Sequence, residues 1–311
     1  MRDQDLSQPR TPRQFLRLYL TGLAIGAADV VPGVSGGTMA FILGVYSTLL
    51  NAIKSFNFKA LRLLLSARIG ELLRHISFFF LLALGAGILT AVLALANALG
   101  NALEQQPTLV YAFFGGLIAA SIISVTLMLR WNLMAALALI VGALFAYWLV
   151  ALPELADADH SFPTLFFSGA VAICAMILPG ISGSFILLIL GQYKFVLDAV
   201  RALDFDSVAA VALGALVGIL AFSRLLSWLL KRYYTTTVAA LVGFMIGSLR
   251  RIWIEGERGL SKLGALGAGE IALIVGLFIA GFVLVSFIDH LQSGRNPLFV
   301  RLWRAQPKEA A

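Results

Sequence analysis

Charged residues and cysteines are both scarce in this chain of 311 residues. Only 13% of the residues are charged, against a usual share of about 25%, whereas 60% are hydrophobic and the mean hydropathy is +0.93. A soluble globular protein and a disordered chain are excluded, because so apolar a sequence does not stay solvated. The single cysteine, Cys174, excludes an internal disulfide framework. The sequence therefore predicts an all-α polytopic membrane protein, a single transmembrane domain over residues 1–311 with room for about eight to ten crossings.

Histidines are also few, and basic residues exceed acidic ones. His75, His160 and His290 lie near segment ends, and none has a Cys, Asp or Glu partner at ligand spacing, so we expect no metal site and no cofactor. The formal net charge of +7 is compatible with nucleic-acid binding. In a membrane protein, however, basic residues gather in cytoplasmic loops, so we expect no nucleic-acid partner.

The first half of the chain contains five apolar segments and one basic loop. An apolar stretch at about 15–28 is followed by a Pro/Gly break from Asp29 to Thr38 and by a second apolar segment to about residue 53. The remaining segments, in chain order, are the basic loop at 54–74 and three plain spans at about 76–99, 108–129 and 133–152. The basic tail and first stretch also fit a secretory signal peptide, although a membrane segment is the favoured interpretation.

The Pro/Gly break occurs twice. Residues Pro32 to Tyr46, the first motif, align without a gap on residues Pro179 to Tyr193, the second motif, and about half of the aligned positions are identical. The second copy is preceded by an apolar segment at about 163–178 and followed by spans at about 207–230, 235–254 and 268–288. The sequence therefore predicts an internal repeat of residues 14–152 and 163–290, each a re-entrant or broken helix pair plus three transmembrane helices.

The short apolar segments beside each break determine the expected topology. At about 14–18 residues each they are short for a full crossing. If each broken pair returns to its starting side, one repeat crosses the membrane an odd number of times, and the two repeats are inverted. Most of the 23 lysines and arginines then lie on the side of the N-terminus, which predicts cytoplasmic N- and C-termini in the cell (inner) membrane. The basic run in the 250–266 loop departs from this bias, so its side stays open.

The residue types at the breaks favour an anion site. Backbone outside a helix survives at membrane depth only inside protein or beside water, so two such breaks indicate a site. Glycine permits close approach, and free N–H groups at a helix N-terminus attract anions. The residues expected to bind the anion are Ser35, Gly36, Gly37, Thr38, Ser182, Gly183 and Ser184. Alternatively, Ser35 and Ser182 only cap interrupted helices.

Four charged residues are considered for this site. Arg224 lies about six residues inside the end of its span, where it either meets the anion or extends to the interface. Arg250 and Arg251 follow a span directly, which fits an interfacial role as well as anion binding. Asp29 is the single carboxylate of the first break, and it either binds a coupling cation or caps the turn.

Four segments of the chain resemble the prokaryotic polyprenyl-phosphate (undecaprenyl-phosphate) translocases. The segments are Gly26 to Thr38, Leu178 to Ser184 with Gly191-Gln-Tyr193, Phe222-Ser-Arg224-Leu-Leu, and Gly247-Ser-Leu-Arg250-Arg-Ile-Trp253. Ile254 stands where the family pattern has proline, which affects only the local turn. The resemblance implies that undecaprenyl phosphate, the lipid carrier of cell-wall sugars, is returned from the outer to the cytoplasmic leaflet. It also implies that the anion bound at the two breaks is the lipid phosphate.

Two other function classes compete with this interpretation. A lipid-modifying enzyme needs a nucleophile and a base, and no histidine lies near the two serine motifs, so we expect no catalytic residues. A secondary transporter or channel for a small soluble anion has the same architecture and is the alternative.

Inward movement of a phosphate into a cell that is negative inside is opposed by the membrane potential, so we expect co-transport of H⁺ or Na⁺. The residues do not specify an oligomeric state.

Overall fold

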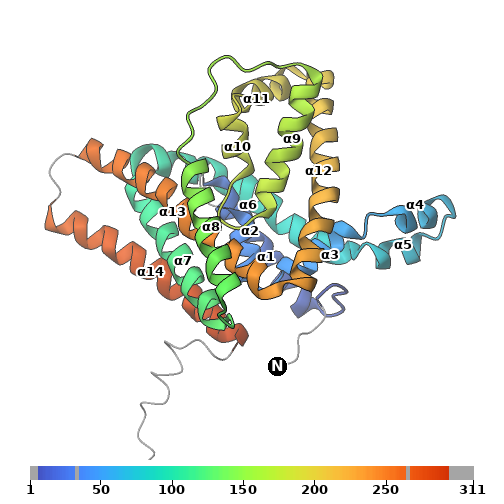
Figure 1. The fold of residues 1–311 in the computed structure, drawn as a ribbon, viewed down its shortest axis with the longest axis horizontal. Helices are drawn as coiled ribbons and strands as arrows, with labels where there is room; N and C mark the ends of the chain where they lie inside the picture. The colour runs from blue at the N-terminus through green and yellow to red at the C-terminus, as the bar shows by residue number, and fades with distance from the viewer. Residues whose placement is uncertain (1–5, 32–34, 264–266, 294–311) are drawn as a thin grey trace, which may run out of the picture.

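The computed structural model describes the whole chain except residues 1–5, 32–34, 264–266 and 294–311, so Pro32 and Gly33 of the first motif lie outside the described residues. The described part is helical and has no strand, which confirms the all-α prediction (Figure 1). The helices of the first half are α1 (Pro12–Val30), α2 (Gly36–Ile42), α3 (Tyr46–Lys54), α4 (Phe58–Leu65), α5 (Ile69–His75), α6 (Phe78–Gln105), α7 (Pro107–Met128) and α8 (Leu133–Leu149). Those of the second half are α9 (Phe162–Ile177), α10 (Gly183–Ile189), α11 (Tyr193–Ala202), α12 (Phe205–Arg232), α13 (Tyr234–Leu263) and α14 (Ala268–Ser293).

Each half has a second bend that the sequence analysis missed. The segment expected to run unbroken to about residue 53 divides into α2 and α3, which meet at 115°, and α10 and α11 meet at 105°. The bends lie at Gly44 and Gly191, whose φ angles are +71° and +67°. Both turns place glycine in the left-handed position of a Schellman motif, with hydrogen bonds from Val45 N to Ala40 O and from Gln192 N to Leu187 O.

The basic segment 54–74 forms helices α4 and α5, where the sequence analysis expected a loop. Asn57 begins α4, because its Oδ1 accepts hydrogen bonds from the N–H groups of Lys59 and Ala60 at 2.9 and 3.2 Å. The two helices form an arm that projects to the side of the molecule (Figure 1). Phe58 and Leu65 are largely exposed on it, so the arm is both basic and apolar.

The long helices pack in pairs that correspond between the halves. Helix α1 packs on α6 as α9 packs on α12, whereas α7 packs on α14 and α8 on α13, so the last two pairs join the halves. Glycine allows the backbones to approach closely: a Cβ atom at Gly87 would lie 2.1 Å from the carbonyl oxygen of Tyr19, and one at Gly214 would lie 1.8 Å from that of Phe166. Such small-residue contacts are typical of helices packed within a membrane.

Within the described residues, five helices are long and apolar enough to cross a membrane, namely α6, α7, α12, α13 and α14. The number rises to seven if each bent pair is counted as one span. These numbers support a multi-pass membrane protein, but they are lower than the eight to ten crossings for which the length has room. The apolar helices α8 and α9 are shorter than these spans and are not counted, and the bent pairs and the arm take up further residues.

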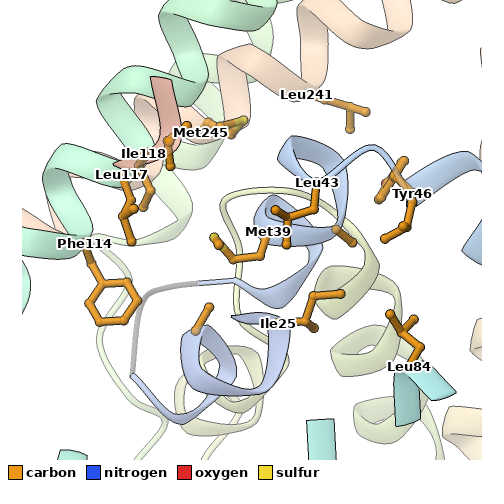
Figure 2. Close-up of a cluster of buried hydrophobic side chains, with 14 of the residues drawn as sticks. Ile25, Met39, Leu43, Tyr46, Leu84, Phe114, Leu117, Ile118, Leu241 and Met245 are labelled. Atoms are coloured by element: carbon orange, nitrogen blue, oxygen red, sulfur yellow. The ribbon is translucent and has the colours of Figure 1, made fainter. Parts of the chain in front are cut away.

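The main apolar core surrounds the first bent pair. Figure 2 shows α2 with its side chains directed toward its neighbours, and the labelled residues come from helices of both halves. They are Ile25, Met39, Leu43, Tyr46, Leu84, Phe114, Leu117, Ile118, Leu241 and Met245. Helix α2 and the bend that follows it are therefore held inside protein.

Candidate functional site

The two broken segments touch each other. The Ser35 hydroxyl donates a hydrogen bond to the carbonyl oxygen of Leu178 at 3.2 Å, and the Gly180 N–H donates one to Thr38 Oγ1 at 2.8 Å. The Tyr46 hydroxyl donates to the carbonyl oxygen of Ile177 at 3.0 Å. Polar groups freed by the end of α9 are thus satisfied by hydroxyl groups of the first motif. Segments more than 130 residues apart in sequence form one polar contact inside an apolar core.

The two motif serines stand at helix starts without acting as side-chain caps. Ser35 and Ser182 are the N-cap residues of α2 and α10, yet neither hydroxyl accepts the capping hydrogen bond in the described structure. Ser35 instead bonds across to Leu178, and Ser182 Oγ lies 2.8 Å from Ser184 Oγ. Ser35 and Ser182 are buried, whereas Ser184 is exposed. The simple capping alternative therefore does not account for the two serines.

Asp29 occupies the N-terminus of α2. Its Oδ1 accepts a hydrogen bond from the Gly36 N–H at 2.7 Å, so a carboxylate sits where the sequence analysis expected an external anion. A Cβ atom at Gly36 would lie 2.4 Å from both carboxylate oxygens, which explains the glycine. A negative charge at this position is favourable, because the first amides of a helix carry partial positive charge. The contact is the turn cap that the residue order allowed.

The other motif glycines allow protein to approach, as Gly36 does. A Cβ atom at Gly37 would lie 2.8 Å from the carbonyl oxygen of Ile177, and one at Gly183 would lie 2.7 Å from that of Ala172. Both contacts hold a short helix against α9. Valine at Gly36 or Gly183 would therefore disturb packing, whether or not a ligand also binds there.

The structure places the two predicted arginines away from the motif contact. Arg224 is exposed, and its guanidinium donates to the carbonyl oxygens of Leu220 at 2.7 Å and Phe56 at 3.2 Å, which ties α12 to the base of the arm. Arg250 donates to the carbonyl oxygen of Tyr147 at 3.0 Å, and its Cζ lies 4.2 Å from the centre of the Tyr147 ring. Among the contacts of the described residues, neither arginine reaches Ser35 or Ser182.

The neighbouring Arg251 lies against the second motif instead. Its Cζ is 4.7 Å from the centre of the Phe185 ring in α10, and its Nη2 is 2.7 Å from Glu255 Oε1. The sequence contained one signal for this residue, the basic run that departs from the expected charge bias. It did not show which face of α13 meets α10, so the prediction named Arg250 and not Arg251.

A hollow lies beside each glycine bend. A cavity of about 350 Å³ next to Gly44 is lined by residues of α2, α3, α7, α12, α13 and α14, including the hydroxyl-bearing Ser47, Ser121, Ser124 and Tyr234. A second hollow of about 460 Å³ lies at Gly191, between α11 and the acidic loop that joins α8 to α9. The two hollows thus lie at corresponding positions of the two halves, one beside each bend.

The acidic loop is fastened over the second bend. Gln192 is fully buried, its Nε2 donates to the carbonyl oxygen of Asp159 at 2.9 Å, and its Oε1 lies 2.8 Å from Nδ1 of His160. The hydroxyl groups of Ser161 and Thr164 donate hydrogen bonds to Asp159, which lowers the pKa of that exposed carboxyl group.

Within the described part of the chain, no three His, Cys, Asp or Glu side chains gather closely enough to hold a metal ion.

Comparison with known proteins gives a consistent set of matches. Residues 25–262 match the model of a family described as undecaprenyl phosphate translocase-like. A Vibrio cholerae protein named polyprenyl-phosphate transporter is 46% identical over 243 residues, which cover 77% of this chain and 78% of that protein. A Staphylococcus aureus protein of the same name is 32% identical over 256 residues, which cover 74% of this chain and 83% of that protein. No solved structure matches.

Proposed function

This chain belongs to the undecaprenyl phosphate translocase-like family, and we propose that it carries a polyprenyl phosphate from the outer to the cytoplasmic leaflet, recycling the lipid carrier of cell-wall synthesis. The names of its relatives indicate transport, not catalysis. In this proposal the protein lies in the inner membrane with both termini cytoplasmic, and its two repeats are inverted.

The chemistry of the lipid explains why a protein is needed. A phosphate monoester carries a charge of about −1.5 to −2 at pH 7. One unit charge at the centre of a bilayer already costs at least about 2.5 to 3.5 kcal/mol on insertion scales, whereas the prenyl tail is at home in lipid. The protein therefore has to provide a polar path for the head group only, and the tail can remain in the membrane beside it.

The contact between the two broken segments carries the proposal. Hydroxyl and N–H groups of both motifs meet there inside an apolar core, and a hollow adjoins each of the two bends. We place the phosphate path along this contact, between the two hollows. The residues proposed to line it are Ser35, Gly36, Gly37, Thr38, Ser182, Gly183 and Ser184. Arg224 and Arg250 lie outside the contact, so they are proposed to meet the phosphate only at the two ends of the path.

Asp29 is proposed to couple transport to a cation gradient. Moving about two negative charges into a cell that is negative inside costs roughly 4.6 kcal/mol per 100 mV, at about 2.3 kcal/mol per charge. Inward flow of H⁺ or Na⁺ offsets this cost. A cation bound to Asp29 weakens its hold on the Gly36 N–H, and this link connects cation binding to the first motif.

Reconstitution of the purified protein tests the proposal. Proteoliposomes receive a fluorescent polyprenyl phosphate in the outer leaflet, and a membrane-impermeant quencher follows its loss from that leaflet. A second set of proteoliposomes is given radiolabelled inorganic phosphate, and its uptake is measured. We expect fast leaflet exchange of the lipid and no uptake of the free ion. Phosphate uptake without lipid exchange would instead establish the alternative, a transporter or channel for a small soluble anion.

A further inference from the structure

Helix α13 carries a compact group of charges near its end. Glu255 Oε1 lies 2.7 Å from Arg251 Nη2 and 2.9 Å from Arg258 Nη1, so one carboxylate oxygen is held by two guanidinium groups. The side chains of Arg251 and Glu255 are only 19% and 18% exposed. We call Arg251, Glu255 and Arg258 the α13 charge cluster. It already binds one anionic group, the carboxylate of its own helix.

The α13 charge cluster lies directly beside the second motif. The Arg251 guanidinium stacks over the ring of Phe185, which follows Ser184 in α10 and is itself buried. The Arg251 Nε is also buried and has no hydrogen-bond partner in the described structure. A buried donor without a partner is unfavourable, so this Nε–H group has capacity for a further acceptor.

We propose that the α13 charge cluster is an exchange site for the phosphate head group, where phosphate replaces the Glu255 carboxylate on Arg251. The inference rests on the proposed function and adds a residue to its path. The planar guanidinium fork fits phosphate and carboxylate equally well in shape, and phosphate has the greater charge and more acceptor oxygens. When Glu255 turns away, Arg251 and Arg258 together present two positive charges beside the second motif.

This assignment also explains a departure from the charge bias of the sequence. In the inverted topology the basic run of α13 lies on the outer side, where lysine and arginine are otherwise few. Positive charge on that side attracts the anionic head group before it enters the protein. Glu255 then has a definite function, because it keeps Arg251 neutralised while no lipid is bound. Release of the lipid returns Arg251 to its ion pair with Glu255.

A purely structural pair is the competing explanation. Arg251 and Glu255 are four residues apart on one helix, a spacing at which opposite charges stabilise α13 without any ligand. The two explanations differ in one consequence. If Glu255 competes with phosphate, then removing its charge strengthens phosphate binding. If the pair is structural, then removing its charge leaves binding unchanged or weakens it.

The test measures binding of farnesyl phosphate to the full-length protein in nanodiscs by isothermal titration, with farnesol as the uncharged comparison. We expect Glu255→Gln to bind farnesyl phosphate several-fold more tightly than the wild type, and Arg251→Gln to bind it at least tenfold more weakly. Arg251→Lys keeps the charge but loses the fork of the guanidinium group. Its affinity should therefore fall between those of the wild type and Arg251→Gln. It also replaces Arg251→Gln in the comparison if that variant does not fold.

The matched control is Glu71→Gln in the arm. Glu71 pairs with Arg68 at 2.5 Å, so this variant makes the same change in charge far from the second motif, and we expect wild-type affinity. An equal gain in Glu255→Gln and Glu71→Gln would show a general charge effect and overturn the inference, as would unchanged or weaker binding by Glu255→Gln. If the wild type binds farnesyl phosphate tightly and both Arg251 variants bind it equally well, the exchange site is refuted but the proposed function is not. Equal affinity of wild type for farnesyl phosphate and farnesol would refute the proposed function.

Discussion

The substitution Thr38→Val tests whether the contact between the two motifs matters for stability and transport. Thr38 is almost fully buried, and its Oγ1 accepts the only hydrogen bond recorded for the Gly180 N–H within the described residues, at 2.8 Å. Valine has nearly the same shape but no acceptor, so the Gly180 N–H is left buried without a partner. The penalty for such a group is about 1–3 kcal/mol.

The membrane setting places the effect in the lower part of that range. Hydrogen bonds between helices in a membrane protein are worth about 0.6 kcal/mol on average and about 1.7 at most, because the unfolded chain also finds partners. We therefore expect Thr38→Val to lower the free energy of unfolding by about 1 to 1.7 kcal/mol. Gly180 has a φ angle of +93°, which glycine adopts readily, and the turn between α9 and α10 loses a contact that holds it in place.

The assay compares Thr38→Val with Thr90→Val. Thr90 is exposed on α6 and bonds only to the carbonyl oxygen of Ala86 in its own helix, at 2.8 Å, so its replacement should cost little. Unfolding in detergent is measured as a function of denaturant, and leaflet exchange is measured in proteoliposomes. We expect Thr38→Val to lose both stability and exchange relative to Thr90→Val. Equal behaviour of the two variants would refute the reasoning.

Three further predictions concern coupling, topology and pH. Asp29→Asn should keep the fold, because the amide oxygen can still accept the hydrogen bond from the Gly36 N–H of α2. Leaflet exchange by this variant should no longer respond to an imposed pH or Na⁺ gradient. A variant with the gradient dependence of the wild type would leave Asp29 as a turn cap only. In a variant lacking the native cysteine, single cysteines at Arg68 and Asp157 should react with impermeant reagents from opposite sides, and labelling from one side would indicate a parallel repeat. Hydrogen bonds, led by that of the Ser161 hydroxyl, lower the pKa of Asp159, so its contribution to stability is present above the ordinary aspartate pKa and is lost as the pH falls through the lower folded pKa. Wild type should therefore be more stable than Asp159→Asn at neutral pH and match it in acid, whereas a constant difference would contradict this.

The long helices were predictable because their apolar runs are unambiguous. The spans expected at about 76–99 and 207–230 correspond to α6 and α12, and the duplicated Pro-Gly-x-Ser-Gly motif identified the segments that now form one contact. The second bend was missed although its signal was present. Gly44 and Gly191 are identical positions of the aligned motif, and a glycine between two apolar runs is a common helix end.

The arm was missed for a different reason. Residues 54–74 combine five basic residues with an apolar face, and the charge count was weighed without the helical period. Asn57 is a recognisable helix start, so its capping role could have been predicted from the sequence. The basic residues were taken to indicate a loop, but a basic segment can face the cytoplasm and still be helical.

The candidate site was predictable only in part. Local sequence identifies which residues interrupt the helices, but it does not show that Asp29 fills the N-terminus of α2 or that the motif glycines face protein. The place of an arginine depends on the rotation of its helix, which is fixed by packing. For this reason Arg250 and Arg251, adjacent in sequence, lie against different helices, with Arg250 on Tyr147 of α8 and Arg251 on Phe185 of α10.

The central claim is that the phosphate of the lipid passes along the contact between the two motifs. A polyprenyl phosphate analogue with a photoreactive group next to its phosphate, bound to the reconstituted wild-type protein and activated by light, tests this claim most directly. Peptide mapping should then find cross-links in residues 29–38 and 176–184, and an excess of unlabelled polyprenyl phosphate should abolish them. Cross-links confined to the arm or to the lipid-facing surfaces of α6 and α12 would contradict the account.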